Sequence, residues 1–267
     1  MTTAAARFRA EYAAHRASEG RGYGPGELLA LPYLASGPLA RQWAVRARTY
    51  LAFASRVLAP AAERLGRAPR VLDLGAGNGW LSWRAALAGS EAVAVDFRDD
   101  GVDGLGAARP FLEHPSGARF ERVAASFDAL PLPTARFDVV VFSASLHYAC
   151  DLAAVLREAR RVAVPGGQLV ILDSPFYGRD ADGAAMVAEK RRAGAATFGA
   201  RADALLALPA VEYLTRARLT DASRGLGLAW RRRRVRYPLW YELRPLVARL
   251  KRRRAPSRFD LWECTVS

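Results

Sequence analysis

A short segment, VLDLGAGNGW at residues 71–80, restricts the fold more than any other part of the chain. An apolar run ends in three glycines, Gly75, Gly77 and Gly79, and the segment that follows, Trp80–Ala88, has the composition of a helix. A strand, a glycine-rich turn and a helix in this order place backbone N–H groups at a helix N-terminus, where a nucleotide can approach closely. The segment therefore predicts an α/β domain that binds a nucleotide-like ligand at this turn.

Further strands and helices alternate after this segment, as in a parallel sheet with crossover helices. Asp151 is suited to cap the helix predicted at 151–164, and Pro165-Gly166-Gly167 is expected to end it. A helix is also expected at 42–65, with a break near Pro60, whereas 20–37 is rich in glycine and proline and is predicted to be a loop. The predicted strands are 70–74, 91–96, 118–124, 138–143, 168–173, 228–237 and 259–266, and further helical segments are expected at 183–208, 214–226 and, in part, 238–257.

The glycine spacing distinguishes between two classes of nucleotide fold. Dinucleotide-binding folds require a small residue where this chain has Trp80, so the fit to G-x-G-x-x-G/A is poor. No G-K-[ST] follows the glycines, which excludes a P-loop. Asp96 ends the next predicted strand, and a carboxylate can accept hydrogen bonds from both hydroxyls of a ribose.

These residues resemble the first motifs of the class I S-adenosylmethionine-dependent methyltransferases. The likeness continues through ASFDALPLPTARFDVVVFSASLHYACD at 125–151 and EARRVAVPGGQLVILD at 158–173, so it covers roughly residues 70–175. It implies a Rossmann-like class I methyltransferase fold, in which a mostly parallel seven-stranded sheet carries helices on both faces and ends in a late antiparallel hairpin. It also implies S-adenosylmethionine as the cofactor.

The resemblance implies a set of cofactor-binding residues. Asp96 would hold the ribose, Phe97 would pack on the adenine, and Asp73 would orient the loop and the methionine amine. The family usually has an acidic residue where this chain has Ser126, and the backbone N–H of Phe127 is a second possible contact to the adenine. The implied cofactor-binding set is Asp73, Gly75, Ala76, Gly77, Gly79, Asp96, Phe97, Ser126, Phe127 and Ser143.

The reaction and the methyl acceptor are less explicit in the sequence. His147 is the candidate general base, because imidazole titrates near neutral pH; the alternative is a packing or cofactor-shell role, which the resemblance favours. Tyr148, Asp173 and Tyr177 are further candidates for the pocket. The motifs of adenine amino-methylation and of C5-pyrimidine methylation are missing, which favours a small-molecule or lipid-like acceptor.

Charge is concentrated near the C-terminal end. Residues 216–258 carry fifteen basic side chains and two acidic ones, whereas the rest of the chain is nearly neutral. This segment has three interpretations: a solvated helix and edge strand, contact with an anionic membrane surface, or nucleic-acid binding by a tRNA or rRNA methyltransferase. A cofactor-binding protein without turnover is a further alternative.

The remaining expectations concern the whole chain. Residues 1–66 are predicted to form a helical cap or lid, with Tyr23, Arg41 and Trp43 over the cofactor, and 67–267 to form the methyltransferase domain with a basic helical insertion at about 238–257. Two distant cysteines and three isolated histidines predict no disulfide framework and no metal site. No signal-peptide pattern or membrane-spanning run is found, so a cytoplasmic location is expected.

Overall fold

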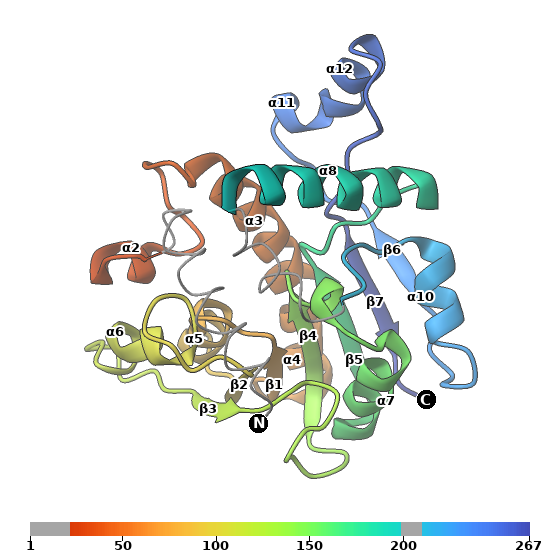
Figure 1. Ribbon diagram of the computed structural model, residues 1–267. Coiled ribbons are helices and arrows are strands. Elements are labelled where there is room, and N and C mark those ends of the chain that lie inside the picture. Colours follow the sequence, from red (N-terminus) through yellow and green to blue (C-terminus); the bar gives the residue numbers. More distant parts are fainter. Residues whose placement is uncertain (1–21, 199–209) are drawn as a thin grey trace.

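A computed structural model describes residues 22–198 and 210–267 of the chain. Its centre is one seven-stranded sheet in the order β3-β2-β1-β4-β5-β7-β6 (Figure 1). The first five strands are parallel, and β7 lies antiparallel to both β5 and β6. The strands are β1 Val71–Leu74, β2 Ala92–Asp96, β3 Glu121–Ala124, β4 Phe137–Ser143, β5 Ala163–Leu172, β6 Arg231–Arg233 and β7 Leu261–Thr265. The predicted sheet, including its late antiparallel hairpin, is confirmed.

Helices cover both faces of the sheet (Figure 1). They are α2 Pro25–Ala30, α3 Ala40–Phe53, α4 Ala59–Leu65, α5 Trp80–Leu87, α6 Arg109–Leu112, α7 Leu152–Val162, α8 Asp180–Phe198, α10 Arg216–Ala222, α11 Leu239–Glu242 and α12 Arg244–Leu250. As predicted, Asp151 caps α7, because its carboxylate accepts from the N–H groups of Ala153 and Ala154.

Side chains along each central strand alternate between two apolar cores. In β1, Val71 packs with α3, α4 and α5 on one face, whereas Leu72 and Leu74 pack with α7 and α10 on the other. The strands are buried on both faces, as expected for a parallel sheet covered by helices, and their apolar runs reflect this burial. Helices α3 and α4 thus pack in the same core as the sheet.

Several predicted boundaries are wrong for identifiable reasons. The segment 20–37 contains the helix α2, which Pro25 begins, because proline is favoured in the first helical turn. Pro60 likewise sits in the first turn of α4 and does not break the helix; the irregularity precedes it, as a π-helical turn at Ala54–Leu58. Pro165-Gly166-Gly167 lies within β5, where the register against β4 shifts.

The C-terminal elements are shorter than predicted. The strand expected at 228–237 is reduced to β6. The basic insertion at 238–257 contains two short helices, α11 and α12, and Pro245 lies in the first turn of the second. The predicted helix 183–208 corresponds to α8 up to Phe198, and the remainder lies outside the described residues. No helix among the described residues has both the length and the apolar composition needed to cross a membrane.

Candidate functional site

The candidate site lies where the parallel strands end. Asp73 and Asp96 are at the carboxyl ends of β1 and β2, Ser143 ends β4, and Asp173 directly follows β5. The strands are parallel and adjacent, so these four side chains come to one edge of the sheet. Ligands of open α/β sheets bind at this edge.

The glycine loop after β1 requires its glycines. Gly75, Gly77 and Gly79 all have positive φ, at 73°, 57° and 80°. A Cβ on Gly75 would lie 2.3 Å from Cβ of Ser145, and one on Gly79 would lie 2.8 Å from the ring of Phe120. The loop is therefore held tightly between the loop after β4 and the segment before β3.

The N–H groups of this loop are already hydrogen-bonded within the protein. Gly75 and Ala76 both donate to the carbonyl of Val95, Gly77 donates to Asp96 Oδ2 at 2.8 Å, and Gly79 donates to Ala76. The sequence predicted that the backbone N–H groups of this turn would be available to a ligand, and for these residues that prediction is wrong. A loop whose donors are used internally suits close contact with a ligand better than it suits binding a phosphate.

Asp96 is held by the backbone on both of its oxygens. Oδ2 accepts from Gly77, and Oδ1 accepts from the N–H of Arg98 at 2.9 Å. Each carboxylate oxygen has a second lone pair, so the fixed carboxylate can still accept from a diol. Burial raises the pKa of Asp96, while the guanidinium of Arg98, 3.9 Å from Oδ1, acts to lower it. Phe97 follows directly and is half-buried.

Asp73 is a buried carboxylate with one unsatisfied oxygen. Ser82 of α5 donates to Oδ2 at 3.0 Å, but Oδ1 has no hydrogen-bond partner among the described residues. Burial raises the pKa of Asp73 to about 7; the neighbouring charge of Asp96 also raises it, and Arg46 acts to lower it. An unsatisfied buried carboxylate oxygen is costly unless a ligand donates to it.

Arg46 of α3 reaches the same edge, which the sequence did not predict. Its Nε lies 3.5 Å from Asp173 Oδ2, and its Nη2 donates to Ser143 Oγ at 3.5 Å. The guanidinium also lies over the rings of Trp43 and Trp80, 4.5 and 5.4 Å from their centroids. Trp80, the residue that disfavours a dinucleotide, thus helps to position a cation at the site.

Asp173 adopts a left-handed backbone conformation, with φ of 52°. Its side chain is buried, its Oδ1 has no hydrogen-bond partner among the described residues, and burial raises its pKa. Non-glycine residues with positive φ are uncommon and cluster at functional sites. Asp173, one of the pocket candidates from the sequence, therefore lies at this edge as a buried carboxylate paired with Arg46.

Ser126 and Phe127 lie on the loop after β3, beside the glycine loop. The exposed Ser126 hydroxyl donates to Asp128 Oδ1 at 2.5 Å, so an acidic group stands next to the position where the family usually has one. Phe127 packs edge-on against Phe142 of β4, and its ring would lie 3.5 Å from a Cβ on Gly75. Asp128 is a candidate polar contact that the motif spacing missed.

His147 lies in a 3₁₀ turn, Leu146–Tyr148, after β4. Its ring is half-buried against Tyr148, with centroids 4.2 Å apart, and Nδ1 is 3.5 Å from the hydroxyl of Ser174. Its carbonyl accepts from the N–H of Glu212. The structure therefore places His147 on the loop next to Ser143 and Ser145, at the same edge of the sheet as the carboxylates.

Tyr177 contacts a different part of the molecule from the carboxylates at the strand ends. Its ring packs edge-on against Tyr213, and its hydroxyl accepts from Arg254 at 3.2 Å. It lines a hollow of about 1010 Å³ between α10, β6 and β7, together with Phe176, Trp230 and Trp262. None of the predicted cofactor-binding residues lines this hollow, and no group of three or more possible metal ligands is found in the described part of the chain.

Taken together, the edge offers complementary groups for three parts of one ligand. Asp96 can accept from a diol, Phe97 and Phe127 can contact an aromatic ring, and the pair Asp73 and Arg46 can bind the ammonium and carboxylate of an amino acid. The loop donors are used internally, so no phosphate is needed to satisfy them. A ligand with a ribose, a base and an amino-acid end, and without phosphate, fits this donor and acceptor set.

Comparison with known families agrees with the fold. Residues 72–171 match the model of a family described as "Methyltransferase domain". A demethylmenaquinone methyltransferase of Mycolicibacterium gilvum is 37% identical over 112 residues, which are 42% of this chain and 45% of that protein. A malonyl-[acyl-carrier protein] O-methyltransferase of Erwinia pyrifoliae is 34% identical over 112 residues, 40% of this chain and 38% of that protein. The chain thus spans less than half the length of each relative.

A solved structure resembles nearly the whole chain. It is a 1,6-didemethyltoxoflavin-N1-methyltransferase from Burkholderia thailandensis with bound 1,6-didemethyltoxoflavin and S-adenosylhomocysteine. The TM-score is 0.56 at 18% identity, and the likeness covers 98% of this chain and 88% of the other. The resemblance to class I methyltransferases that the motifs indicated is confirmed, as is the fold.

Proposed function

We propose that this chain, which carries a class I methyltransferase domain, transfers a methyl group from S-adenosylmethionine to a small-molecule or lipid-like acceptor. The unsatisfied, buried Oδ1 of Asp73, at the same strand ends as the fixed carboxylate of Asp96, is the observation that carries the proposal. Bound at this edge, the cofactor would supply an electrophilic methyl group on a sulfonium. The residues of the chain would hold it and orient the acceptor.

The proposed cofactor contacts follow the chemistry of each side chain. Asp96 accepts from the ribose hydroxyls, and Asp73 accepts from the amino group of the methionine part. Arg46 pairs with the carboxylate of that part, and Phe97 and Phe127 contact the adenine. Gly75, Ala76, Gly77, Gly79, Ser126 and Ser143 complete the proposed set, and no metal ion is part of it.

Residues 1–66 are proposed to cap the site, and the described part of this region supports that role. Trp43 donates from Nε1 to the hydroxyl of Tyr23 at 2.9 Å, and its ring packs edge-on against Trp80. Arg41 lies over the ring of Trp240, 5.5 Å from its centroid, which links α3 to α11. Through Arg46, the same helix reaches the strand ends.

Transfer of a labelled methyl group to a cell extract tests the function. We expect label from S-adenosylmethionine to enter the lipid or small-molecule fraction in proportion to the amount of enzyme, and to remain at background in the RNA fraction. The names of the relatives, a quinone and an acyl carrier among their substrates, support this acceptor class. Label in the RNA fraction would replace the proposal with the RNA alternative, and S-adenosylhomocysteine binding without any labelled product would favour a protein without turnover.

Ion pairing weakens the RNA alternative. Its strongest sequence support is the run Arg231–Arg234, yet every arginine of this run is paired with an acidic side chain. Arg231 and Arg233 pair with Glu263, Arg232 with Asp260, and Arg234 with Glu242. Arginines that are already paired with carboxylates neutralise fewer phosphates, so fewer counterions are released from the nucleic acid on binding. This run is therefore poorly suited to bind a phosphate backbone.

The raised pKa of Asp73 predicts that cofactor binding depends on pH. Below the pKa of about 7, Asp73 is protonated in the free protein and cannot pair with the ammonium group. We expect the affinity for S-adenosylhomocysteine to fall as the pH is lowered from 8 to 6, with a slope approaching about tenfold per pH unit below the pKa. Burial also raises the pKa of Asp96, which adds to the fall in affinity. The positive charge of Arg46 acts to lower the pKa of Asp73 and therefore opposes the fall.

Calorimetry at several pH values, in buffers of different ionisation enthalpy, measures both the affinity and the proton released on binding. Asp73→Asn should bind more weakly at pH 8 and show a shallower slope. The sign is opposite for folding: because the folded pKa of Asp73 is raised, this group's contribution to the free energy of unfolding is largest at low pH and is lost as the pH rises through 7. Equal affinity of the unmodified protein at pH 6 and 8 would contradict the assigned contact.

A further inference from the structure

Residues 238–257, here called the projection, stand clear of the body of the molecule and carry α11 and α12 (Figure 1). One face of the projection is apolar and open to solvent. Its side chains follow helical spacing, and Leu239 and Leu250 are 73% and 75% exposed. We call this set, Leu239, Leu243, Leu246, Val247 and Leu250, the apolar face. Exposed apolar side chains gathered on one element indicate a surface that binds a partner molecule or a membrane.

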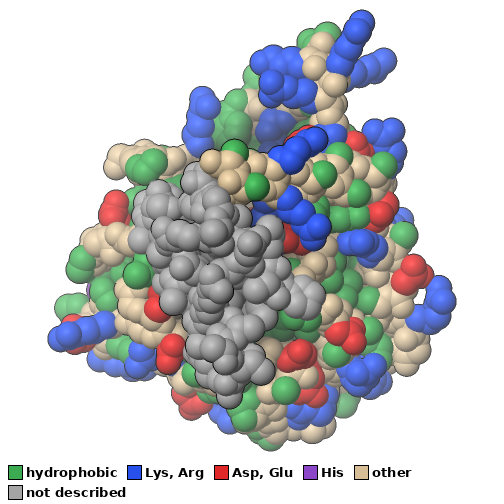
Figure 2. Space-filling view, in the orientation of Figure 1, with side chains coloured by type: hydrophobic (Ala, Val, Ile, Leu, Met, Phe, Trp, Pro, Cys, Tyr) green, Lys and Arg blue, Asp and Glu red, His purple; other side chains and the backbone are tan. Residues whose placement is uncertain are grey.

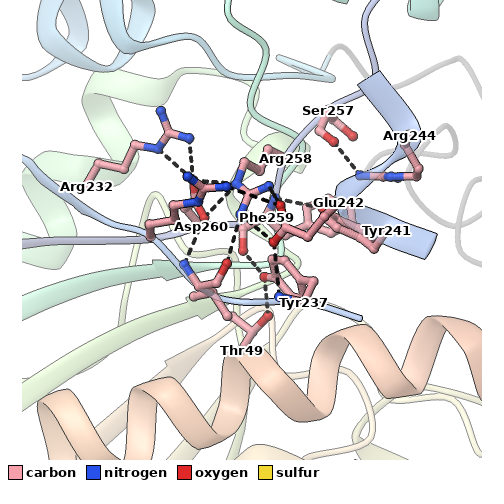
Figure 3. A network of polar contacts seen from close by, with 12 residues as sticks. Thr49, Arg232, Tyr237, Tyr241, Glu242, Arg244, Ser257, Arg258, Phe259 and Asp260 are labelled. Carbon is pink, nitrogen blue, oxygen red and sulfur yellow. Dashed lines mark hydrogen bonds and ion pairs between the residues drawn. The ribbon is translucent and has the colours of Figure 1, made fainter. Parts of the chain in front are cut away.

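The base of the projection is firmly held (Figure 3). Arg258 donates through both terminal nitrogens to the carboxylate of Glu242, at 2.9 and 3.0 Å. The buried Asp260 accepts from Arg232, Arg258 and the N–H of Val235. Arg258 lowers the pKa of Glu242 to about 2, so this clamp stays charged at ordinary pH. The apolar face is therefore presented on a fixed support.

Further contacts tie the same region to the rest of the fold. The hydroxyl of Tyr237 lies 2.8 Å from Thr49 Oγ1 of α3, and Arg244 donates to the carbonyl of Ser257 at 2.7 Å. Arg254 pairs with Glu189 of α8 at 2.8 Å. The bond from Arg244 joins the start of α12 to the end of the projection, and the other two bonds tie this region to α3 and α8.

A basic cluster follows the apolar face. It consists of Arg249, Lys251, Arg252 and Arg253, all exposed and without an ion pair among the described residues. Lysine and arginine side chains gather on the projection in Figure 2. Eight of the fifteen basic residues in 216–258 are paired with acidic side chains, namely Arg218, Arg224, Arg231, Arg232, Arg233, Arg234, Arg254 and Arg258. The unpaired charge is thus concentrated at the end of α12.

We propose that the projection docks on an anionic lipid surface, with the apolar face entering the headgroup region and the basic cluster pairing with lipid phosphates. Short amphipathic helices with leucine on one side and arginine or lysine beside it bind membranes in this way. An RNA would use the basic cluster but leave the leucines in water. A second copy of the chain would bring two basic clusters close together, which like-charge repulsion opposes.

This proposal is independent of methyl transfer, although the two fit together. The projection contacts α3 through Trp240 and α8 through Arg254. Helix α3 also carries Arg46, which lies at the strand ends. A lipid surface bound by the projection would therefore lie on the side of the molecule that α3 caps.

Vesicle flotation of the full chain tests the proposal. We expect binding to vesicles of phosphatidylcholine mixed with phosphatidylglycerol, at least about tenfold stronger than to phosphatidylcholine alone. Replacing Leu246 and Leu250 with serine should lower the binding by about tenfold or more, and so should replacing the four residues of the basic cluster with glutamine. Both sets are exposed, so the fold and the affinity for S-adenosylhomocysteine should be unchanged.

Matched controls separate this surface from general charge and hydrophobicity. Leu87→Ser removes an exposed leucine from α5, and glutamine at Arg48, Arg64, Arg119 and Arg157 removes the same number of exposed charges elsewhere. Both controls should float as the unmodified protein does. No binding to anionic vesicles, equal binding to neutral ones, or equal loss in the controls would overturn the proposal. So would a dimer or an RNA complex that is lost in the projection variants, without vesicle binding.

Discussion

Replacing Asp96 with alanine should weaken S-adenosylhomocysteine binding by about a hundredfold or more. The carboxylate is fixed by the N–H groups of Gly77 and Arg98, so it meets a ribose diol without losing further side-chain freedom. Two hydrogen bonds to a charged acceptor contribute roughly 1.5–3 kcal/mol each, which corresponds to at least a hundredfold in affinity. Isothermal titration calorimetry measures the change directly.

Two further variants make this result specific. Asp96→Asn keeps the shape and one acceptor oxygen, so it should fall between the unmodified protein and Asp96→Ala. Glu121→Ala removes an exposed carboxylate from the far end of β3, and its affinity should stay within about twofold. If Asp96→Ala folds, as its circular dichroism would show, and binds as tightly as the unmodified protein, the ribose contact is wrongly assigned.

Local patterns in the sequence predicted the centre of this fold well. Each central strand is a short apolar run that ends at a glycine or a polar residue, and the helices between them have clear spacing and caps. Asp73 and Asp96 were found in the same way, because each stands at a strand end. Motif spacing therefore identified the part of the site built by adjacent strands.

Contacts between distant segments were not predictable in this way. Arg46 lies in a helix well before β1, and nothing in its local sequence distinguishes it from the other arginines of α3. Only the packing of α3 beside α5, where Trp43 meets Trp80, brings its guanidinium to Asp173 and Ser143. The one local signal for this contact was Trp80, an aromatic residue at the position where dinucleotide-binding folds have a small one.

The net charge of residues 216–258 overstated the positive surface, because contacts with other parts of the chain neutralise many of its arginines. The basic segment 216–258 suggested one continuous positive surface, yet several of its arginines pair with Glu189, Asp180, Asp260 and Glu263, which lie elsewhere in the sequence. A sum over a segment cannot show which charges the fold neutralises. Of the seven basic side chains in 216–258 that have no ion pair among the described residues, four form the basic cluster at the end of α12, next to the apolar face.

The role of His147 as general base stays a prediction, and a large effect is expected from removing it. Many methyl acceptors carry a proton that must leave as the new bond to the methyl carbon forms. His147 stands at the strand ends beside Ser145, which touches the glycine loop, and its Nδ1 is near the hydroxyl of Ser174. A hydrogen bond from Nδ1 to Ser174 would leave Nε2 as the basic nitrogen.

His147→Ala should lower the rate of labelled methyl incorporation by about a hundredfold at saturating substrate, the lower end of what general base catalysis contributes. Affinity for S-adenosylhomocysteine should change by less than about twofold, because none of the proposed cofactor contacts is removed. His114→Ala, at a half-buried histidine packed against Trp83, is the matched control and should retain the full rate. An unchanged rate in His147→Ala would leave this residue a packing role against Tyr148, and proton removal would then fall to solvent or to the acceptor itself.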